Sequence, residues 1–429
     1  MKRILISELK YYINKKVTIQ GWIHKVRKLK NITFVIIRDR SGLVQCIIAN
    51  NKLDLSKLKL ESIVSILGEV KENTNDLNSF EIQVENIEII NAALDELPIL
   101  INKESLDINL DTMLNNRILS LRHPNINSIF KVQNSIINGF REFLNKEDFT
   151  EIHTPKIVLE GAEGGTEVFK VKYFENTAYL AQSPQFYKQM MIGAGFERVF
   201  EIGHAYRAEE HNTNRHLNEY ISMDLEIGFI DDEKDIMKFE ERLLKFILEK
   251  LNNECIEYFN LLGSELPKIE NGIPKITFDE ALNILSKNYN KTDLNSDLDP
   301  EGEKLICKYA KENLNSDFIF LTNYPRSKRP MYTMPLGENY THSFDLLFRG
   351  IEITTGGQRI HDYNMLINNI KLKGFNPKDY ESYISVFKYG MPKHGGLAIG
   401  LERITSRLLG LENVREATLI TRDRTRLLP

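Results

Sequence analysis

Residues 207–226, RAEEHNTNRHLNEYISMDLE, place arginines, acids and histidines close together without an aliphatic stripe. The alternating segment VFEIGHAY precedes it and EYISMDLEIGF begins at its residue 219, so we expect two strands with a long charged hairpin tip between them. Arg207 offers a fork of N–H donors that suits a phosphate or a carboxylate. Glu209 and Glu210 can accept from a nucleobase amine or a ribose hydroxyl. By itself the stretch also fits a solvated hairpin of paired charges that binds nothing.

Two later stretches carry groups that suit polyphosphate chemistry. In FDLLFRGIEITTGGQRIHD, residues 344–362, Glu352 and Thr355 can place oxygens on a hard cation such as Mg²⁺. In GGLAIGLERITSRLLG, residues 395–410, glycines precede a helix expected to begin near Leu401, with Arg403 in its first turn. An arginine there strengthens a helix N-terminal field that already favours anions. The alternative for Arg403 is an ordinary position on a helix surface.

Two further segments could hold a second substrate. In AQSPQFYKQ, residues 181–189, Gln185 and Lys188 are three apart and share one face of the predicted helix. A lysine there can meet a carboxylate as a point charge, although exposed helical lysines are common. The loop EGAEGGTEVF, residues 160–169, combines glycines with Glu163 and is either a mobile lid or an ordinary connection.

Composition limits what can position these groups. The chain has 429 residues, no signal-like N-terminus and no apolar run long enough to span a membrane. Three scattered cysteines, with no Cys-x-x-Cys pair, argue against a disulfide framework or structural zinc and favour a cytoplasmic protein. Residues 1–60 hold fourteen Lys or Arg against three acids, a local charge of +11 in a chain of net charge −4. Such a basic module on an acidic body indicates a polyanionic partner at one end.

The basic region has the strand pattern of a small barrel. VTIQGWIHKV, ITFVIIRD, LVQCIIAN, ESIVSILGEV and FEIQVENIEII alternate, with turn signals between them. Five short strands with a basic face predict an OB-type barrel, a frequent reader of single-stranded nucleic acid. We place this domain at residues 1–95. Trp22, Phe34 and Phe80 could stack on bases, or fill the core.

The rest of the chain predicts a larger α+β domain. Residues 96–125 have no clear periodicity and are expected to form a linker or hinge. From there to residue 429 helical patterns, near 129–143 and 235–251, alternate with strand-like segments at 199–206, 221–230, 343–355 and 397–401. FTEIHTPKI, with Pro155 at a bend, is expected to form another strand. Together they favour a mixed, mainly antiparallel sheet flanked by helices.

These stretches together resemble the class II aminoacyl-tRNA synthetases, in particular the aspartyl-tRNA synthetases of the archaeal and eukaryotic type. GWIHKVR and IRDRSGLVQ resemble the anticodon-binding barrel, FTEIHTPKI the dimer-forming first motif, YRAEEHNTNRHLNEY the second and GLAIGLERI the third. The likeness extends over essentially the whole chain. It implies a homodimer whose partners are tRNA(Asp), ATP and L-aspartate, with Mg²⁺ as cofactor.

The resemblance also implies sites. The catalytic arginines are Arg207 and Arg403, and the Mg²⁺ ligands are Glu352 and Thr355, where many relatives have serine at the second position. The aspartate pocket is expected at Glu163, Gln185, Lys188, Arg207, Asp224, Thr355 and Arg359. The ATP site is expected at Arg207, Ala208, Glu209, Arg215, His216, Leu217, Tyr220, Glu352, Gly400, Leu401, Glu402 and Arg403.

Three alternatives stay open beside it: an asparaginyl-tRNA synthetase, a synthetase-like binding protein without activity, and a tRNA-independent amidating enzyme. The lysine and arginine of the pocket favour aspartate, because asparagine would leave a buried charge unpaired at a cost of about 2–5 kcal/mol. Degenerate relatives typically lose the motif arginines, which this chain has. An amidating enzyme would not need the basic barrel.

The resemblance finally raises the choice of tRNA. The position after GW-I influences anticodon choice in this family, and His24 occupies it. Relatives with tryptophan there tend to accept only tRNA(Asp), whereas histidine occurs in forms that also charge tRNA(Asn). Leu77, near a second such position, matches neither pattern. The hypothesis is therefore relaxed tRNA specificity.

Overall fold

The computed structural model describes residues 2–50, 58–73, 80–159, 167–294 and 297–428. Its contacts divide the chain into two units, residues 1–108 and 109–429. The expected boundaries at 95 and 125 stay predictions; the range 96–125 includes two short helices, α1 (Leu110–Asn115) and α2 (Arg117–Ser120). No helix in the described ranges is long and apolar enough to cross a membrane.

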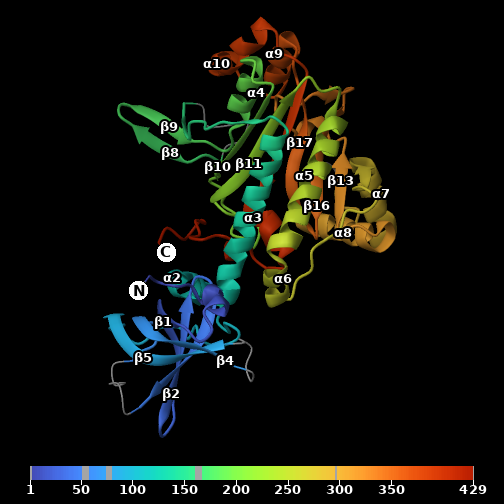
Figure 1. Cartoon of the computed structure of the whole chain (residues 1–429). Coiled ribbons are helices and arrows are strands. Elements are labelled where there is room, and N and C mark those ends of the chain that lie inside the picture. Colours follow the sequence, from blue (N-terminus) through green and yellow to red (C-terminus); the bar gives the residue numbers. More distant parts are fainter. Residues whose placement is uncertain (1, 51–57, 74–79, 160–166, 295–296, 429) are drawn as a thin grey trace. The chain divides into compact units, whose positions relative to one another are not determined.

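The first unit is the closed barrel that the strand pattern predicts (Figure 1). Its strands are ordered β1-β2-β3-β5-β4, and a short 3₁₀ helix, Ile6–Tyr11, precedes them. The strand bounds are β1 Lys16–Lys28, β2 Ile32–Asp39, β3 Gly42–Ala49, β4 Ile63–Glu72 and β5 Phe80–Asn91. Every second residue of β2, β3 and β4 is buried over most of its length, as expected for a strand with one face on a core. Trp22, Phe34 and Phe80 are half-buried, which leaves their faces partly available.

The second unit is built on an eight-stranded sheet in the order β12-β13-β16-β17-β18-β11-β10-β6. Only the outermost pairs, β12 with β13 and β10 with β6, are parallel, so the expected mixed and mainly antiparallel sheet is confirmed. The bounds are β6 Thr150–Glu151, β10 Arg198–Tyr206, β11 Glu219–Gly228, β12 Lys275–Thr277, β13 Phe318–Thr322, β16 Ser343–Phe348, β17 Ile351–Arg359 and β18 His394–Gly400. Two small sheets complete it, β7 (Ile157–Val158), β8 (Lys170–Tyr173) and β9 (Asn176–Leu180) in one, β14 (Pro335–Leu336) and β15 (Tyr340–Thr341) in the other.

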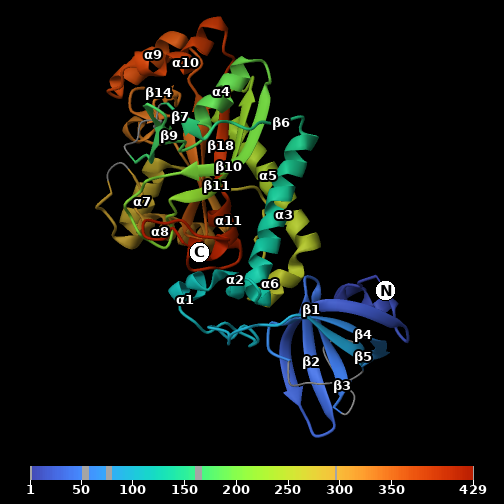
Figure 2. The same ribbon diagram turned by 90° about the vertical axis from the view of Figure 1, so that its left-hand side faces the viewer.

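Helices α3 (Pro124–Lys146) and α5 (Glu233–Glu254) cover one face of this sheet (Figure 2). Their apolar stripes join the sheet residues that point the same way, such as Met223, Leu346 and Ile399, in one core. The helices expected near 129–143 and 235–251 are thereby confirmed. The others are α4 Gln185–Gly193, α6 Ile256–Leu262, α7 Phe278–Tyr289, α8 Pro300–Leu314, α9 Tyr363–Leu372, α10 Glu381–Ile384 and α11 Leu401–Leu408. On the opposite face α7 and α8 pack on Ile319, Leu321 and Leu347, and α4 packs next to β10 and β11, while β11 and β17 between them carry polar side chains such as Asp224 and Thr355.

Two strand expectations differ from the structure in detail. Residues 343–355 form two strands, because Arg349 and Gly350 both adopt positive φ, 45° and 90°, and turn the chain between β16 and β17. FTEIHTPKI divides into β6 and β7, which belong to different sheets and lie on either side of Pro155. Proline has no N–H for a strand ladder, so the break falls there.

Candidate active site

The charged stretch forms the tip of a hairpin, as predicted. Strands β10 and β11 pair from Arg198–Ile227 to Tyr206–Glu219, and residues 207–218 make the loop between them. Asn218 holds the base of the loop, since its side-chain amide donates to the carbonyls of Arg207 (2.7 Å) and Glu209 (3.0 Å). The backbone N–H of Arg207 donates back to the carbonyl of Asn218 at 2.9 Å. The charges therefore lie on a loop with a fixed base.

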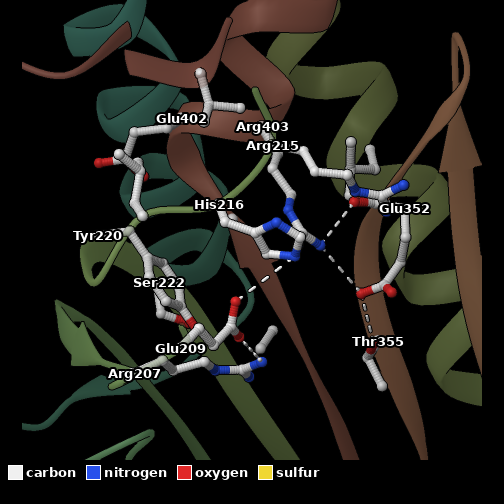
Figure 3. A pocket seen from close by; sticks show the side chains of 15 residues that line it. Arg207, Glu209, Arg215, His216, Tyr220, Ser222, Glu352, Thr355, Glu402 and Arg403 are labelled. Carbon is white, nitrogen blue, oxygen red and sulfur yellow. Dashed lines mark hydrogen bonds and ion pairs between the residues drawn. The ribbon is translucent and has the colours of Figure 1, made fainter. Parts of the chain in front are cut away.

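A pocket lies between this loop, β17, β18 and the start of α11 (Figure 3). It is lined by Arg207, Glu209, Arg215, His216, Leu217, Tyr220, Ser222, Glu352, Ile353, Thr355, Ala398, Gly400, Glu402, Arg403 and Val414. Figure 3 shows His216 and the Arg403 guanidinium between Glu209 on one side and Glu352 on the other. Cations and carboxylates thus alternate around one cavity, which suits a ligand that carries both phosphates and hydrogen-bond donors.

The Glu352 end of the pocket is a candidate place for a cation. Burial opposes ionisation of Glu352, but Arg403 and the Thr355 hydroxyl more than offset it and hold its pKa below the usual value. Thr355 donates to the Glu352 carboxylate at 2.9 Å. Asp345 pairs with Thr355 across β16 and β17, and its Oδ1 is buried with no hydrogen-bond partner among the described residues. The ionised Glu352 carboxylate, the Thr355 hydroxyl and the Asp345 Oδ1 are oxygen ligands of the kind that Mg²⁺ prefers.

The hairpin loop presents His216 as a neutral ring. Burial lowers its pKa, and Arg403 and Arg215 lower it further, against the opposing effect of Glu209. Its Nδ1 lies 2.6 Å from the Thr213 hydroxyl and its Nε2 3.6 Å from the Glu209 carboxylate. Such a ring can exchange hydrogen bonds with a ligand without adding a charge to the pocket.

Arg215 lines the same pocket but is held from behind. Its Nη2 donates to both oxygens of Glu303 on α8, at 2.7 and 2.8 Å. Glu303 also accepts the backbone N–H of Glu352 at 2.9 Å, so one carboxylate connects the hairpin loop to β17. Burial raises the pKa of Glu303 and Arg215 opposes it. Glu303 is therefore a brace between two walls of the pocket.

Beside the pocket lies a fully buried group of paired charges. Lys188 on α4 donates to Asp224 at 2.8 Å and lies 3.6 Å from Glu226, and both acids point from the same face of β11. Arg359, at the end of β17, donates through Nε to Glu226 at 3.0 Å. Gln185 is 3.5 Å from Glu226 and 3.4 Å from Arg359. Two cations, two carboxylates and one amide make a compact, charge-balanced cluster.

Two features hold this cluster in place. Gly396 lies next to Glu226 across β11 and β18, and an added Cβ there would lie 2.2 Å from the Glu226 carboxylate. Gln189, one residue after Lys188, lies 2.9 Å from the His394 Nε2 and accepts from the Tyr383 hydroxyl at 3.0 Å. Burial lowers the pKa of His394 to about 4, so this ring stays neutral. The neutral chain of hydrogen bonds fixes α4 and with it Lys188.

The structure brings together most of the residues expected at the site. Ala208 and Leu401 do not line the pocket. Leu401 is buried in the core, and the backbone N–H of Ala208 donates to the backbone carbonyl of Glu167. Glu402 lines it, but both carboxylate oxygens accept from the backbone N–H of Ile221 at 3.2 Å. Glu163 and Leu77 lie outside the described residues.

His24 lies in the barrel, at the irregularity where β1 shifts register against β2. It is 7 % exposed, and its Nδ1 is 3.0 Å from the Arg38 Nη1. Since a guanidinium can only donate, the ring nitrogen accepts. Arg38 in turn forms a two-pronged pair with Glu61 at 3.0 and 2.7 Å.

Three residues of the site, Glu226, Asp345 and Glu303, were not predicted from the sequence. Glu226 had a signal, because it follows Asp224 by two positions in a strand and must share its face. Asp345 had a weaker one, a lone acid in the apolar strand FDLLF. Glu303 had none: it lies on a helix 88 positions from Arg215, and only the fold brings them together.

Comparison with known proteins agrees with this geometry. Residues 109–424 match the family described as tRNA synthetases class II (D, K and N), and residues 17–90 match the OB-fold nucleic acid binding domain. The chain is 48% identical to an aspartate–tRNA(Asp/Asn) ligase of Thermus thermophilus over 100% of both chains. It is 43% identical to an aspartate–tRNA(Asp) ligase of Pyrococcus abyssi over 99% of this chain and 98% of the relative.

Among solved structures, asparaginyl-tRNA synthetase from Pyrococcus horikoshii complexed with asparaginyl-adenylate superposes with a TM-score of 0.93. That protein is 31% identical, and the match covers 100% of both chains. The barrel is thus of the OB type, and the eight-stranded sheet with its charged hairpin pocket is a synthetase catalytic domain. The chain belongs to the class II tRNA synthetases of the D, K and N group.

Proposed function

We propose that this chain is an aminoacyl-tRNA ligase that attaches L-aspartate to tRNA(Asp), using ATP and an aspartyl-adenylate intermediate. The observation that carries the proposal is the buried cluster of Lys188 and Arg359, next to a pocket with the charges of a nucleotide site. The identities of the two aspartate ligases named above support the same amino acid.

The first step joins the α-carboxylate of aspartate to the α-phosphorus of ATP and releases pyrophosphate. No side chain needs to form a covalent bond, so the protein contributes position and charge. Arg207 lines the pocket from the hairpin loop and Arg403 from α11, and both would stabilise the charge that develops on the phosphates. In the second step a terminal ribose hydroxyl of the tRNA attacks the acyl carbon and AMP leaves.

Glu352 and Thr355 would hold Mg²⁺, and Asp345 is placed to join them. When bound, the ion would neutralise phosphate charge and orient the leaving pyrophosphate. Arg403 supports this arrangement, because its Nη1 donates to the backbone carbonyl of Glu352 at 3.1 Å. The bond fixes the orientation of Arg403 and Glu352 relative to each other.

The cluster favours aspartate over asparagine. A bound aspartate would present its side-chain carboxylate to Lys188 and Arg359 and its ammonium to Asp224, and the charges would remain balanced. Asparagine brings no side-chain charge, so one buried cation would lose a partner, at a cost of about 2–5 kcal/mol. An asparaginyl enzyme is therefore the weaker alternative.

Pyrophosphate exchange with aspartate and asparagine side by side tests this proposal. We expect aspartate to support exchange at least about thirtyfold better, which corresponds to the low end of that cost, about 2 kcal/mol. Exchange that prefers asparagine would overturn the amino-acid assignment, and no exchange with either would favour an inactive binding protein.

We also propose that tRNA(Asn) is charged with aspartate, as the name of the Thermus thermophilus relative says of that protein. His24 supports this, because the resemblance associates histidine at this position with forms that also charge tRNA(Asn). Arg38 holds the ring in place, with Nδ1 as the acceptor. The test is to charge purified tRNA(Asn) with labelled aspartate. Normal charging of tRNA(Asp) with none of tRNA(Asn) would remove the relaxed specificity and leave the main proposal standing.

A cytoplasmic homodimer completes the proposal, on the grounds of the family resemblance of FTEIHTPKI to the dimer-forming motif. Light scattering coupled to gel filtration should give twice the chain mass of 49.8 kDa. A mass of one chain at micromolar concentration would contradict the dimer.

A further inference from the structure

The C-terminal segment, residues 412–426, lies against the outside of the hairpin loop, residues 207–218. Its backbone makes two bonds to the loop, from the N–H of Val414 to the carbonyl of Asn214 (3.0 Å) and from the N–H of Asn218 to the carbonyl of Arg422 (3.0 Å). Asn214 also donates to the carbonyl of Glu412 at 3.2 Å. The segment therefore follows the loop along most of its length.

Two arginines of the segment reach the part of the loop that is otherwise exposed. Arg424 donates to the carbonyl of Glu210 at 2.8 Å, and Arg415 donates to the side-chain oxygen of Asn212. The loop has no helix or strand of its own between β10 and β11, and residues 210–214 are exposed. A loop of this kind takes its conformation from whatever is bonded to it.

The segment is itself fixed to the body of the second unit. Arg117, a buried residue of α2, donates to the carbonyls of Glu416, Thr418 and Leu419 at 3.0, 2.5 and 2.9 Å. Gln133 on α3 donates to the carbonyl of Ala417 at 2.8 Å, and Arg426 donates to Asn115 of α1 at 2.6 Å. The C-terminal end lies near α2 in both views (Figures 1 and 2). Movement of the loop is thus limited by helices at the start of this unit.

We propose that Arg415 and Arg424 are positioning residues of the ATP site, which act through the hairpin loop without touching the ligand. The inner side of the loop carries Arg207, Glu209 and His216 into the pocket, so an ordered loop meets ATP with less conformational entropy to lose. The proposal rests on the proposed function, because ATP is the ligand whose binding is helped.

Kinetics of pyrophosphate exchange give the first test. Arg424→Ala should raise KM for ATP on the order of three- to tenfold, the equivalent of one lost hydrogen bond. Arg415→Ala should raise it at least as much, because it also removes the ion pair of Arg415 with Asp423 at 2.9 Å. KM for aspartate should stay unchanged, since among the described residues no hydrogen bond joins the Lys188 cluster to the segment. Arg424→Lys should restore most of the affinity, because an ammonium can also donate to a single carbonyl.

Arg422→Ala is the matched control. It removes the same charge from the same segment, but within the described ranges the Arg422 side chain donates only to the neighbouring carbonyl of Thr421, and its backbone carbonyl keeps the bond to Asn218. An equal rise in KM for ATP in Arg422→Ala would overturn the proposal, since loss of charge would then explain the effect. A parallel rise in KM for both substrates would overturn it as well.

Hydrogen exchange of the ligand-free protein separates this proposal from the proposed function. Amides of residues 207–218 should exchange faster in Arg415→Ala and Arg424→Ala than in the wild type or Arg422→Ala, whether or not the protein activates aspartate. Unchanged exchange in both variants would refute the positioning role even if the wild type is an active ligase. If the wild type catalysed no pyrophosphate exchange, the proposed function would be refuted. The positioning role would still be decided by the hydrogen-exchange rates of the loop amides.

Discussion

The two regions that we propose for binding, the amino-acid cluster around Lys188 and the nucleotide pocket, lie on the same face of the sheet and differ in how deeply their charges are buried. In the amino-acid cluster the side chains of Lys188, Asp224 and Glu226 are 0 %, 2 % and 0 % exposed, and each cation already has an acid as partner. In the nucleotide pocket the side chain of Arg207 is 48 % exposed and that of Arg403 27 %. One region is desolvated before any substrate arrives, and the other keeps its arginines partly in water.

This difference bears on what each region can select. A buried charge without a partner costs several kcal/mol, so a desolvated cluster discriminates strongly between a charged and an uncharged side chain. A half-exposed arginine is solvated by water when no ligand is bound, so its unpaired charge costs little free energy, and it attracts any phosphate. Strict choice of amino acid and graded affinity for ATP are therefore expected from the same sheet face.

The largest expected effect comes from Lys188→Met. Loss of the lysine leaves Asp224 and Glu226 short of a cation in a buried place, and removes one partner of the substrate carboxylate. Aspartate-dependent pyrophosphate exchange should fall by roughly a thousandfold, the equivalent of about 4 kcal/mol. Binding of a non-hydrolysable ATP analogue, measured by calorimetry, should persist because the nucleotide pocket is lined by other residues.

Lys250→Met is the control for that variant, since Lys250 pairs with Glu254 and Glu142 away from the site, and it should leave exchange unchanged. Retained aspartate activation in Lys188→Met would take the lysine out of the pocket. Loss of ATP binding together with activation would show that the two regions do not differ as described.

A smaller effect is expected when the nucleotide pocket loses a brace. Glu303→Gln keeps one oxygen acceptor for the Arg215 Nη2 group, but it removes the negative charge and the second acceptor oxygen. It also weakens the hydrogen bond from the backbone N–H of Glu352. KM for ATP should rise about tenfold, while KM for aspartate stays constant. Glu301→Gln, on the same helix but paired with the distant Lys291, should change neither value. An equal effect on both substrates would mean that Glu303 supports the whole domain.

The contrast between these regions was only half visible in the sequence. Hydrophobic alternation gave the hairpin strands and the helices α3 and α5, and motif arginines such as Arg207 and Arg403 marked the nucleotide pocket, because each of these signals is local. Lys188 and Gln185 shared a predicted helix face for the same reason. The partners that neutralise or brace these groups lie far away along the chain, as Glu226 does from Arg359 and Glu303 from Arg215.

The other two differences from the expectations, at residues 343–355 and at Leu401, also depend on backbone geometry and packing. Residues 343–355 have the apolar character of one strand, and nothing in that pattern gives the positive φ at Arg349 that makes two. Leu401 stands in a motif that borders ATP, yet an apolar side chain at the start of a helix turns to the core. Sequence patterns predict which element a residue belongs to; its partner depends on how the elements pack.

The smallest effect on the reaction, and a sharp test of the contrast, concerns a buried acid with no cation. Glu240 lies on α5 at the opposite face of the sheet, beside Thr354, and burial raises its pKa to about 8. Glu226 is as deeply buried, but Arg359 and Lys188 overcome the effect of burial and lower its pKa. Burial alone therefore does not decide whether an acid is ionised in this fold; the cations next to it do.

The sign of the pH dependence follows from the two pKa values of Glu240. Below about pH 4.5 the group is protonated in both the folded and the unfolded chain, and between 4.5 and 8 only the folded chain keeps the proton. Stability should therefore fall as pH rises through that window, by at most about 5 kcal/mol in all. Glu402, whose pKa burial also raises to about 8, adds a fall of the same sign. Glu240→Gln should remove only the first contribution.

Thermal midpoints of the wild type and Glu240→Gln between pH 5 and pH 8 measure this directly. The amide adds a constant offset, so the test is the slope: the difference in midpoint should grow steadily in favour of the variant as pH rises. Pyrophosphate exchange at pH 7 should be unchanged, because Glu240 lies on the face away from both binding regions. A constant difference across the range would mean that Glu240 is ionised in the fold, and that an acid can be buried here without a cation.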